Sequence, residues 1–245
     1  MTEPTFRTAL IQGASRGLGL EIARQLAAEG TRVFGTCRQP GTAGALQQVT
    51  ADVVRLDLAD ESTIAAAAET VGSETDALDL VMNVSGLLHD GALQPEKRLE
   101  DLESTALARL FQVNAIGPAL VAKHMHRLLK HDRRAVLANV SARVGSIEDN
   151  RLGGWYGYRA SKAAQNMLTK TMAIELGRRA PNAIVLALHP GTVDTDLSKP
   201  FQRNVPEGKL FSVERAAGQL LAIVRDATEE DHGSFRAWDD SPIPW

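Results

Sequence analysis

A glycine-rich segment directly after the first apolar run constrains the fold of this chain more than any other feature. Residues 13–19 read GASRGLG, between a strand-like run at residues 7–12 and a helical pattern at residues 18–29. Glycine allows a tight turn and lets the backbone approach a ligand closely. The free amides at the start of the following helix then suit a pyrophosphate. The spacing G-x3-G-x-G is a weak signal alone, but its place between strand and helix predicts dinucleotide binding.

Strand-like and helical segments alternate along almost all of the 245 residues. The expected strands are 7–12, 31–36, 53–58, 78–84, 135–140, 183–188 and a short last one at 234–238. The expected helices are 18–29, 60–71, 102–129 with a bend near Gly117-Pro118, 160–178 and 213–225. This order predicts an α/β fold, a single Rossmann-type domain over residues 1–245. Its doubly wound parallel sheet should have about seven strands, with helices on both faces.

Three loops should meet at the carboxyl edge of this sheet, where ligands bind in such folds. They are residues 87–97, 143–155 and 197–210, after the fourth, fifth and sixth strands. The apolar residues in or beside them either line a substrate pocket or pack locally; they are Leu87, Leu88, Trp155, Leu197, Phe201 and Phe211. His89 and His189 lie near the same edge, with a substrate contact or a structural role as the alternatives.

Composition excludes several classes of partner. The formal net charge is −3 and basic residues occur only in short pairs such as Arg133-Arg134, so we expect no nucleic-acid partner. The N-terminus lacks the pattern of a signal peptide, and no apolar run approaches a membrane span, so we expect a cytoplasmic protein with no membrane partner. His124, His126 and His131 lack the spacing of a zinc helix, and we expect no metal site.

The end of the second strand predicts the cofactor. An acidic residue there binds the ribose 2′-hydroxyl of NAD, but no Asp or Glu stands between Gly30 and Ala51. Arg38 stands at that place instead, and Arg16 in the glycine turn can point the same way. Guanidinium groups pair bidentately with phosphate oxygens. The sequence therefore predicts NADP(H) in preference to NAD(H), unless both arginines are ordinary surface residues.

Tyr158 and Lys162 are the strongest candidates for the chemistry. They are four residues apart near the start of a helical segment, so both side chains lie on one face. A phenol is a weak acid with a pKa of about 10, and a nearby ammonium is expected to lower that pKa. The pair can then act as a general acid–base on a substrate oxygen. Alone, such a pair is usually a solvated helix face; in a fold with a glycine turn it predicts hydride transfer to or from a small carbonyl or alcohol.

The chain resembles the short-chain dehydrogenase/reductase family over nearly its whole length. The matching motifs are GASRGLG at 13–19, Asp57-Leu58, Asn83 to Gly86, Asn114, Ser141 within NVSARVG, YGYRASK at 156–162, and Pro190-Gly191. Residues 150–156 (NRLGGWY) and the Pro244-Trp245 end are similar to C-factor-like or sniffer-like carbonyl reductases. The resemblance allows a second function, a cofactor-binding signalling or regulatory protein with little turnover.

The resemblance implies roles for individual residues. Asp57 and the Leu58 amide would bind adenine, Asn83 and Gly86 would pass near its ribose, and Lys162 would hold the nicotinamide ribose. Asn114 would bind a water that links Lys162 to solvent. The whole cofactor site would comprise Gly13, Ser15, Arg16, Gly17, Leu18, Gly19, Arg38, Asp57, Leu58, Asn83, Gly86, Tyr158, Lys162, Pro190, Gly191, Val193 and Thr195. The helices at 102–129 and 160–178 would form a homodimer or homotetramer.

One departure from the family pattern concerns the catalytic serine. It should stand three residues after Asn139, where this chain has Ala142. Ser141 stands one residue earlier and Ser146 four residues later. Because side chains alternate along a strand, an offset of one residue matters unless the strand has ended. We expect Ser141 to complete the site with Tyr158, Lys162 and Asn114, with Ser146 as the alternative.

Overall fold

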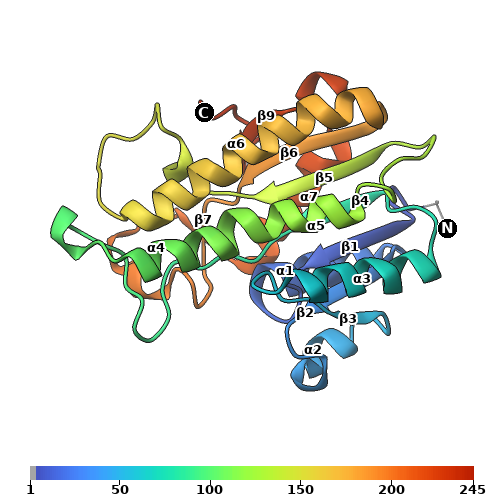
Figure 1. Cartoon of the computed structure of the whole chain (residues 1–245), viewed down its shortest axis with the longest axis horizontal. Coiled ribbons are helices and arrows are strands. Elements are labelled where there is room, and N and C mark those ends of the chain that lie inside the picture. The colour runs from blue at the N-terminus through green and yellow to red at the C-terminus, as the bar shows by residue number, and fades with distance from the viewer. Residues whose placement is uncertain (1–3) are drawn as a thin grey trace.

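A parallel sheet of seven strands forms the centre of the molecule in the computed structural model, which describes residues 4–245 (Figure 1). The strands are β1 (Thr8–Gln12), β2 (Arg32–Cys37), β3 (Val53–Arg55), β4 (Leu80–Asn83), β5 (Ala135–Val140), β6 (Ala183–His189) and β9 (Ser234–Ala237). Their order is β3-β2-β1-β4-β5-β6-β9, with every neighbouring pair parallel. The direction of winding reverses between β1 and β4, which is where such sheets bind ligands.

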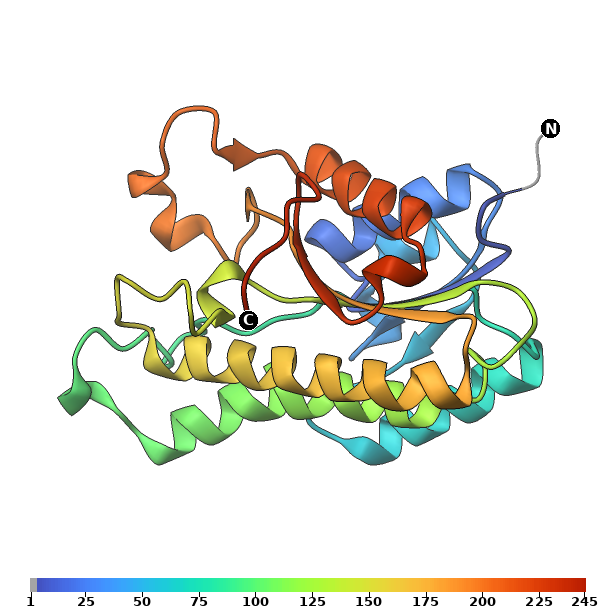
Figure 2. The ribbon, with the colours of Figure 1, turned by 90° about the horizontal axis from the view of Figure 1, so that it is seen from above.

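Helices cover both faces of the sheet, as the alternation predicts (Figure 2). The helices are α1 (Gly17–Ala28), α2 (Gly44–Gln47), α3 (Glu61–Glu74), α4 (Ser104–Phe111), α5 (Gly117–Met125), α6 (Tyr156–Arg179) and α7 (Val213–Asp226). The helices α1 and α7 lie on one face, and α3, α4, α5 and α6 lie on the other. The predicted doubly wound Rossmann fold is thus confirmed.

The inner strands are largely apolar because both of their faces are buried, whereas the edge strands β3 and β9 are only partly buried. In β1, Ala9 and Ile11 pack against α1 and α7, whereas Leu10 between them packs against α3 and α5. All six residues of β5 are buried. Alternate side chains of the inner strands therefore pack into two separate hydrophobic cores, one on each face of the sheet.

The predicted helix at 102–129 is divided. A π-helical turn, Gln112–Ile116, separates α4 from α5, immediately before the predicted bend at Gly117-Pro118. Pro118 has no amide to donate to the preceding turn, which favours such an irregularity. Contrary to expectation, the run Ser104–Met125 is long and apolar enough to meet a length-and-composition criterion for a membrane span. In this structure it packs against α3 and α6.

Two element ends that border the functional edge differ from prediction. α6 begins at Tyr156, four residues before the predicted start at 160, and β3 ends at Arg55 rather than 58. The early start of α6 has a tertiary cause, since the Gly157 amide donates to the buried Glu96 carboxylate at 3.2 Å. A short sheet of β7 (Thr192–Val193) and β8 (Leu210–Phe211) was not predicted.

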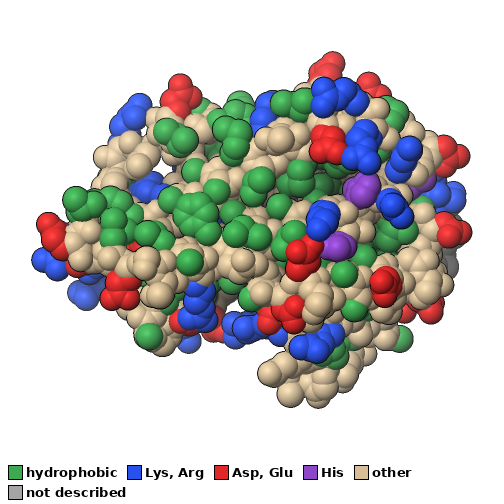
Figure 3. Space-filling view, viewed as in Figure 1, with side chains coloured by type: hydrophobic (Ala, Val, Ile, Leu, Met, Phe, Trp, Pro, Cys, Tyr) green, Lys and Arg blue, Asp and Glu red, His purple; other side chains and the backbone are tan. Residues whose placement is uncertain are grey.

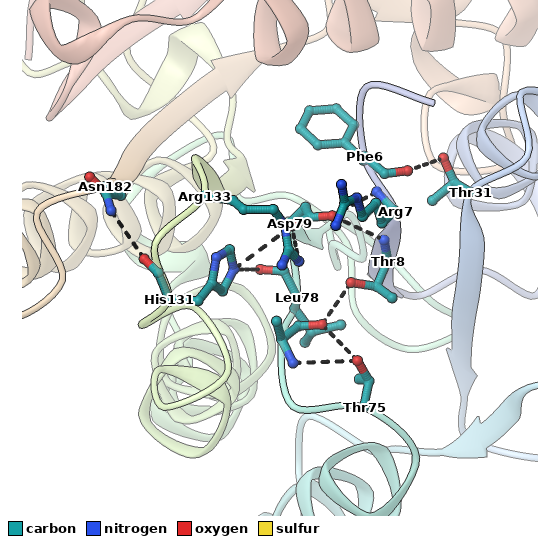
Figure 4. Close-up of polar contacts among 11 residues, drawn as sticks. Phe6, Arg7, Thr8, Thr31, Thr75, Leu78, Asp79, His131, Arg133 and Asn182 are labelled. Carbon is teal, nitrogen blue, oxygen red and sulfur yellow. Dashed lines mark hydrogen bonds and ion pairs between the residues drawn. The ribbon is translucent and has the colours of Figure 1, made fainter. Parts of the chain in front are cut away.

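A buried carboxylate organises the opposite edge of the sheet (Figure 4). Asp79 is 3% exposed and accepts the backbone amides of Arg7 and Thr8, at 2.6 and 3.2 Å. The guanidinium of Arg133 donates to it at 2.7 Å, and His131 Nε2 lies 3.8 Å away. The carboxylate thus joins β1, β4 and the segment before β5. His131 belongs to this internal cluster, since its Nε2 also lies 3.0 Å from the Leu78 carbonyl oxygen.

Candidate active site

A cleft of about 1340 Å³ runs along the carboxyl edge of the sheet. It is bordered by the glycine turn, the ends of β2, β4, β5 and β6, and the first turns of α6. The predicted site residues that line it are Gly13, Ser15, Arg16, Gly17, Leu18, Gly19, Arg38, Asp57, Leu58, Gly86, Ser141, Tyr158, Lys162, Pro190, Gly191, Val193 and Thr195. Asn83 and Asn114 are buried, at 1% and 0% exposed. The fold therefore brings together residues from across the chain.

The glycine turn leaves no room for a side chain at Gly13 or Gly19. Gly13 has φ of +85°, and a Cβ there would lie 2.0 Å from Ser85 Oγ. A Cβ at Gly19 would lie 2.3 Å from the Gly13 carbonyl oxygen. α1 starts directly after Arg16, whose side chain does not cap it, so its first amides remain available to a ligand. The turn fits a pyrophosphate.

The two arginines at the adenosine end differ in their surroundings. Arg38 lines the cleft and is exposed at the end of β2. Arg16 Nη1 lies 3.4 Å from Asp196 Oδ2, and both side chains are mostly exposed. This ion pair links the glycine turn to the segment after β7. An exposed pair of this kind is weak, so Arg16 can leave Asp196 for a phosphate group.

Tyr158 and Lys162 lie on one face of α6, at the cleft. Both are buried, at 7% and 2% exposed, and Lys162 Nζ lies 5.9 Å from the centre of the Tyr158 ring. Lys162 Nζ donates to the Val140 carbonyl and to Gln165 Oε1, both at 2.9 Å. Gln165 is a contact that we did not predict, although its i,i+3 spacing from Lys162 could have indicated it.

Burial dominates the ionisation of both groups. It raises the pKa of Tyr158 above its ordinary value and lowers the pKa of Lys162 to about 7. We expected the ammonium to give Tyr158 a lowered pKa; that expectation is wrong for the net shift, which burial directs upward. The reason is that desolvation disfavours the charged form of each group. Tyr158 therefore keeps its proton at neutral pH and can donate it.

Asn114 holds the backbone that follows β4. Its Oδ1 accepts the Leu87 amide at 2.7 Å, and its Nδ2 donates to the Leu87 carbonyl at 2.8 Å and to Ser161 Oγ at 3.0 Å. A Cβ on Gly86 would lie 3.7 Å from both Asn114 Oδ1 and Lys162 Nζ. Asn114 thus lies directly behind the lysine. The water relay that the resemblance implies for Asn114 stays a prediction.

Asn83 belongs to a polar chain beneath the cleft. Its Nδ2 donates to Asn139 Oδ1 at 2.7 Å, and Asn139 Nδ2 donates to Thr169 Oγ1 at 2.9 Å. These bonds connect β4, β5 and α6 through the interior. The side chain of Asn83 therefore holds the central strand, while Gly86 offers backbone to the cleft.

The two candidate serines differ. Ser141 lines the cleft but its hydroxyl donates to Asn166 Oδ1 at 2.6 Å. Ser146 Oγ accepts the Asp149 amide at 3.1 Å and donates to the Trp245 carbonyl at 3.4 Å. These bonds fix the loop after β5 against the chain end, so Ser146 serves local structure. Ala142, at the position of the expected serine, lines the cleft with its methyl group.

Aromatic side chains from three loops surround the far end of the cleft. The Trp155 and Phe201 ring centres are 4.8 Å apart, and those of His89 and Phe201 are 5.7 Å apart. The Trp155 ring also lies edge-on to Tyr158, at 6.3 Å. Leu87, Leu88 and Leu197 line the same space. Phe211, the other aromatic candidate, instead packs against Trp238 at 4.7 Å. The predicted apolar pocket is present without it.

Known proteins share this arrangement. The family model for short chain dehydrogenases matches residues 7–206. The 1-hydroxy-2-glutathionyl-2-methyl-3-butene dehydrogenase of Rhodococcus sp. (strain AD45) is 30% identical over 97% of this chain and 99% of that protein. The NADPH-bound carbonyl reductase from chicken fatty liver superposes with a TM-score of 0.88 at 28% identity, covering 100% of this chain and 96% of that one. The carbonyl reductase Sniffer of D. melanogaster gives 0.85 at 26% identity, covering 98% and 99%.

Proposed function

This chain belongs to the short chain dehydrogenase family of NAD(P)-dependent oxidoreductases, and we propose that it uses NADP(H) to reduce a small carbonyl compound. One observation carries the proposal: Tyr158, a buried phenol that keeps its proton, lies beside Lys162 in a cleft that also contains the glycine turn. A protonated phenol is the form that a carbonyl reduction requires, because the substrate oxygen gains a proton. The intact pair favours an enzyme over a signalling protein with little turnover.

The residues of the cleft fit the cofactor. The amides of α1 and the glycine turn would hold the pyrophosphate, and Arg38 with Arg16 would bind the 2′-phosphate. Asp57 and Leu58 would bind adenine. The nicotinamide end would be held by Lys162, Pro190, Gly191, Val193 and Thr195. When bound, the reduced nicotinamide supplies the hydride. The chicken carbonyl reductase was solved with NADPH, which supports the choice of phosphate-bearing cofactor.

The protein's own contribution is to position and protonate. The aromatic rings of Trp155 and Phe201 would exclude water from the substrate carbon. Tyr158 would donate its hydroxyl proton to the substrate oxygen, and Lys162 would stabilise the resulting phenolate. Because the pKa of Lys162 is near 7, the lysine can also return a proton to Tyr158 after each turnover.

The substitution Tyr158→Phe tests the proposed chemistry. It removes the donated proton and leaves the ring, so we expect carbonyl reduction to fall by about 1000-fold or more while NADPH still binds. The measurements are NADPH oxidation across a panel of aldehydes and ketones, and nicotinamide fluorescence for binding. Turnover by the variant equal to that of the wild type, or no turnover by the wild type on any substrate, would refute the proposal.

The cofactor preference has a separate test. The substitution Arg38→Ala should weaken NADPH binding by about tenfold or more and leave NADH binding nearly unchanged, because only NADPH carries the 2′-phosphate. Titration of both cofactors by fluorescence gives the two affinities. Tighter binding of NADH than of NADPH by the wild type would contradict the assignment.

An apolar face supports a homodimer or homotetramer. Figure 3 shows hydrophobic side chains gathered over α4, α5 and α6. Ile116, in the turn between α4 and α5, and Met167 and Ile174 of α6 are 42%, 67% and 57% exposed. Exposed apolar side chains of this kind favour association. Sedimentation of the wild type and of a Met167→Glu, Ile174→Glu double variant tests this: the variant should dissociate, and a monomeric wild type would refute the assembly.

We also propose that the protein acts in the cytoplasm.

A further inference from the structure

The wall of the cleft at the end of β5 lacks a free hydroxyl donor. Ala142 stands at the position where the family pattern has serine, and it offers a methyl group. The Ser141 hydroxyl is already directed to Asn166 Oδ1. Reduction of a carbonyl builds negative charge on its oxygen, and such sites gain much of their rate from preorganised donors aimed at that oxygen. A donor besides Tyr158 must therefore come from another element.

His189 stands beside this wall. It ends β6, the strand paired with β5, and the Ser141 amide donates to the Leu188 carbonyl at 2.7 Å. In register, position 189 is therefore the neighbour of position 141. His189 lines the same cleft as Ala142 and Tyr158. Its Nδ1 atom is buried without a hydrogen-bond partner, so Nε2 is the ring nitrogen that remains for the cleft.

The surroundings keep this imidazole neutral. Burial, and secondarily the Arg143 guanidinium, lower the pKa of His189 to about 4, against the opposing effect of Asp239. A neutral imidazole carries one proton, and the other nitrogen is an acceptor. A buried N–H without a partner is rarer than a buried acceptor without one, which places the proton on Nε2. The ring can therefore donate into the cleft without bringing a positive charge.

We propose that His189 is a catalytic residue whose Nε2–H donates a hydrogen bond to the substrate carbonyl oxygen, in place of the hydroxyl missing at position 142. The inference rests on the proposed carbonyl reduction and adds a second donor to it. Tyr158 transfers its proton to this oxygen, whereas His189 keeps its own and only polarises the carbonyl group.

A cycle of variants tests the inference. His189→Leu should lower kcat/KM by about 100-fold, mostly in kcat, as loss of an oxyanion donor does, while His189→Gln, which keeps a donor, should lose less. Ala142→Ser should raise the activity of the His189→Leu variant by at least about tenfold but change the wild type little. His89→Leu is the matched control, a cleft histidine bound to backbone carbonyls, and should change KM more than kcat.

The outcomes separate the two claims. If the wild type turns over no aldehyde or ketone of the panel, the proposed function itself is refuted, whatever the variants do. An active wild type with an equally active His189→Leu variant would refute the role of His189 alone, and so would the absence of rescue by Ala142→Ser in a folded His189→Leu protein. Circular dichroism of each variant establishes that it folds.

A second readout does not depend on activity. Histidine-specific ¹⁵N NMR at pH 7 reports the protonation of each ring nitrogen, and His189→Gln assigns the resonances. We expect a neutral ring protonated on Nε2, with no titration above pH 5. A charged ring at pH 7, or a proton on Nδ1, would overturn the inference.

Discussion

Replacing Lys162 by methionine should stabilise the folded protein while abolishing its activity. The side chain is 2% exposed, and burial lowers its pKa from 10.5 to about 7. At about 1.4 kcal/mol per pKa unit, keeping the charge in the folded state at pH 7 costs about 4 kcal/mol. Methionine removes that cost but loses two hydrogen bonds from Nζ, to Val140 and Gln165, worth about 1 kcal/mol each. The net gain is about 1 to 2 kcal/mol.

The gain must depend on pH in a definite direction. Because the pKa of Lys162 is lower in the folded than in the unfolded protein, the native state binds fewer protons between pH 7 and about 10. The wild type therefore becomes more stable as pH rises through this window, by about 2 kcal/mol from pH 7 to pH 9 from this group alone. The methionine variant lacks this contribution. Its advantage should vanish by about pH 9.

Urea unfolding followed by circular dichroism at pH 7, 8 and 9 measures both effects. The difference between the two proteins cancels other titrating groups. Lys170→Met is the matched control: Lys170 lies on the same helix and its Nζ also donates to a backbone carbonyl, that of Gly233 at 2.9 Å, but the side chain is exposed, so the substitution removes a hydrogen bond without removing a buried amine. Parallel pH dependences of the wild type and Lys162→Met, or a variant less stable than the wild type at pH 7, would refute the reasoning.

Three further substitutions separate structure from catalysis. Asp79→Asn weakens the buried cluster with Arg133 and should cost about 2 to 3 kcal/mol of stability. Calorimetry should therefore show a lower Tm for this variant. A more than twofold change in activity at 25 °C would contradict the structural role of Asp79. Ser146→Ala should leave kcat within about twofold of the wild-type value, since the hydrogen bonds of Ser146 fix a loop. A tenfold loss in kcat would show instead that Ser146 takes part in the reaction. Gly13→Ala adds a Cβ 2.0 Å from Ser85 Oγ at a residue with positive φ, and it should weaken NADPH binding by about tenfold or more. Unchanged NADPH binding, measured by fluorescence, would contradict the inference that the turn has no room for this side chain.

The order of elements and the cofactor cleft could be predicted because they depend on local pattern. Fully apolar strands and periodic helices identify the doubly wound sheet, and its carboxyl edge then collects the glycine turn, Arg38 and the Tyr158–Lys162 pair. The 3.6-residue period alone placed the last two on one face. No long-range information was needed for these conclusions.

The features that sequence reasoning missed depend on contacts between distant segments. The start of α6 is set by Glu96, some sixty residues earlier in the chain. The direction of the Tyr158 pKa shift depends on how completely the folded chain excludes water, which spacing cannot indicate. The hydrogen bonds of Ser141 and Ser146 likewise could not be predicted, because their partners, Asn166 and the Trp245 carbonyl, lie far along the chain.

α6 carries both the chemistry and much of the central packing. Along one face of this 24-residue helix, Tyr158 and Lys162 border the cleft, Thr169 closes the polar chain to β5, and Ala173 and Leu176 enter the core. The proposed catalytic groups therefore belong to a helix that is packed into the core, whereas Trp155 and Phe201 belong to loops. On heating, substrate selectivity should decline first, while the ability to transfer a proton should persist until the whole domain unfolds.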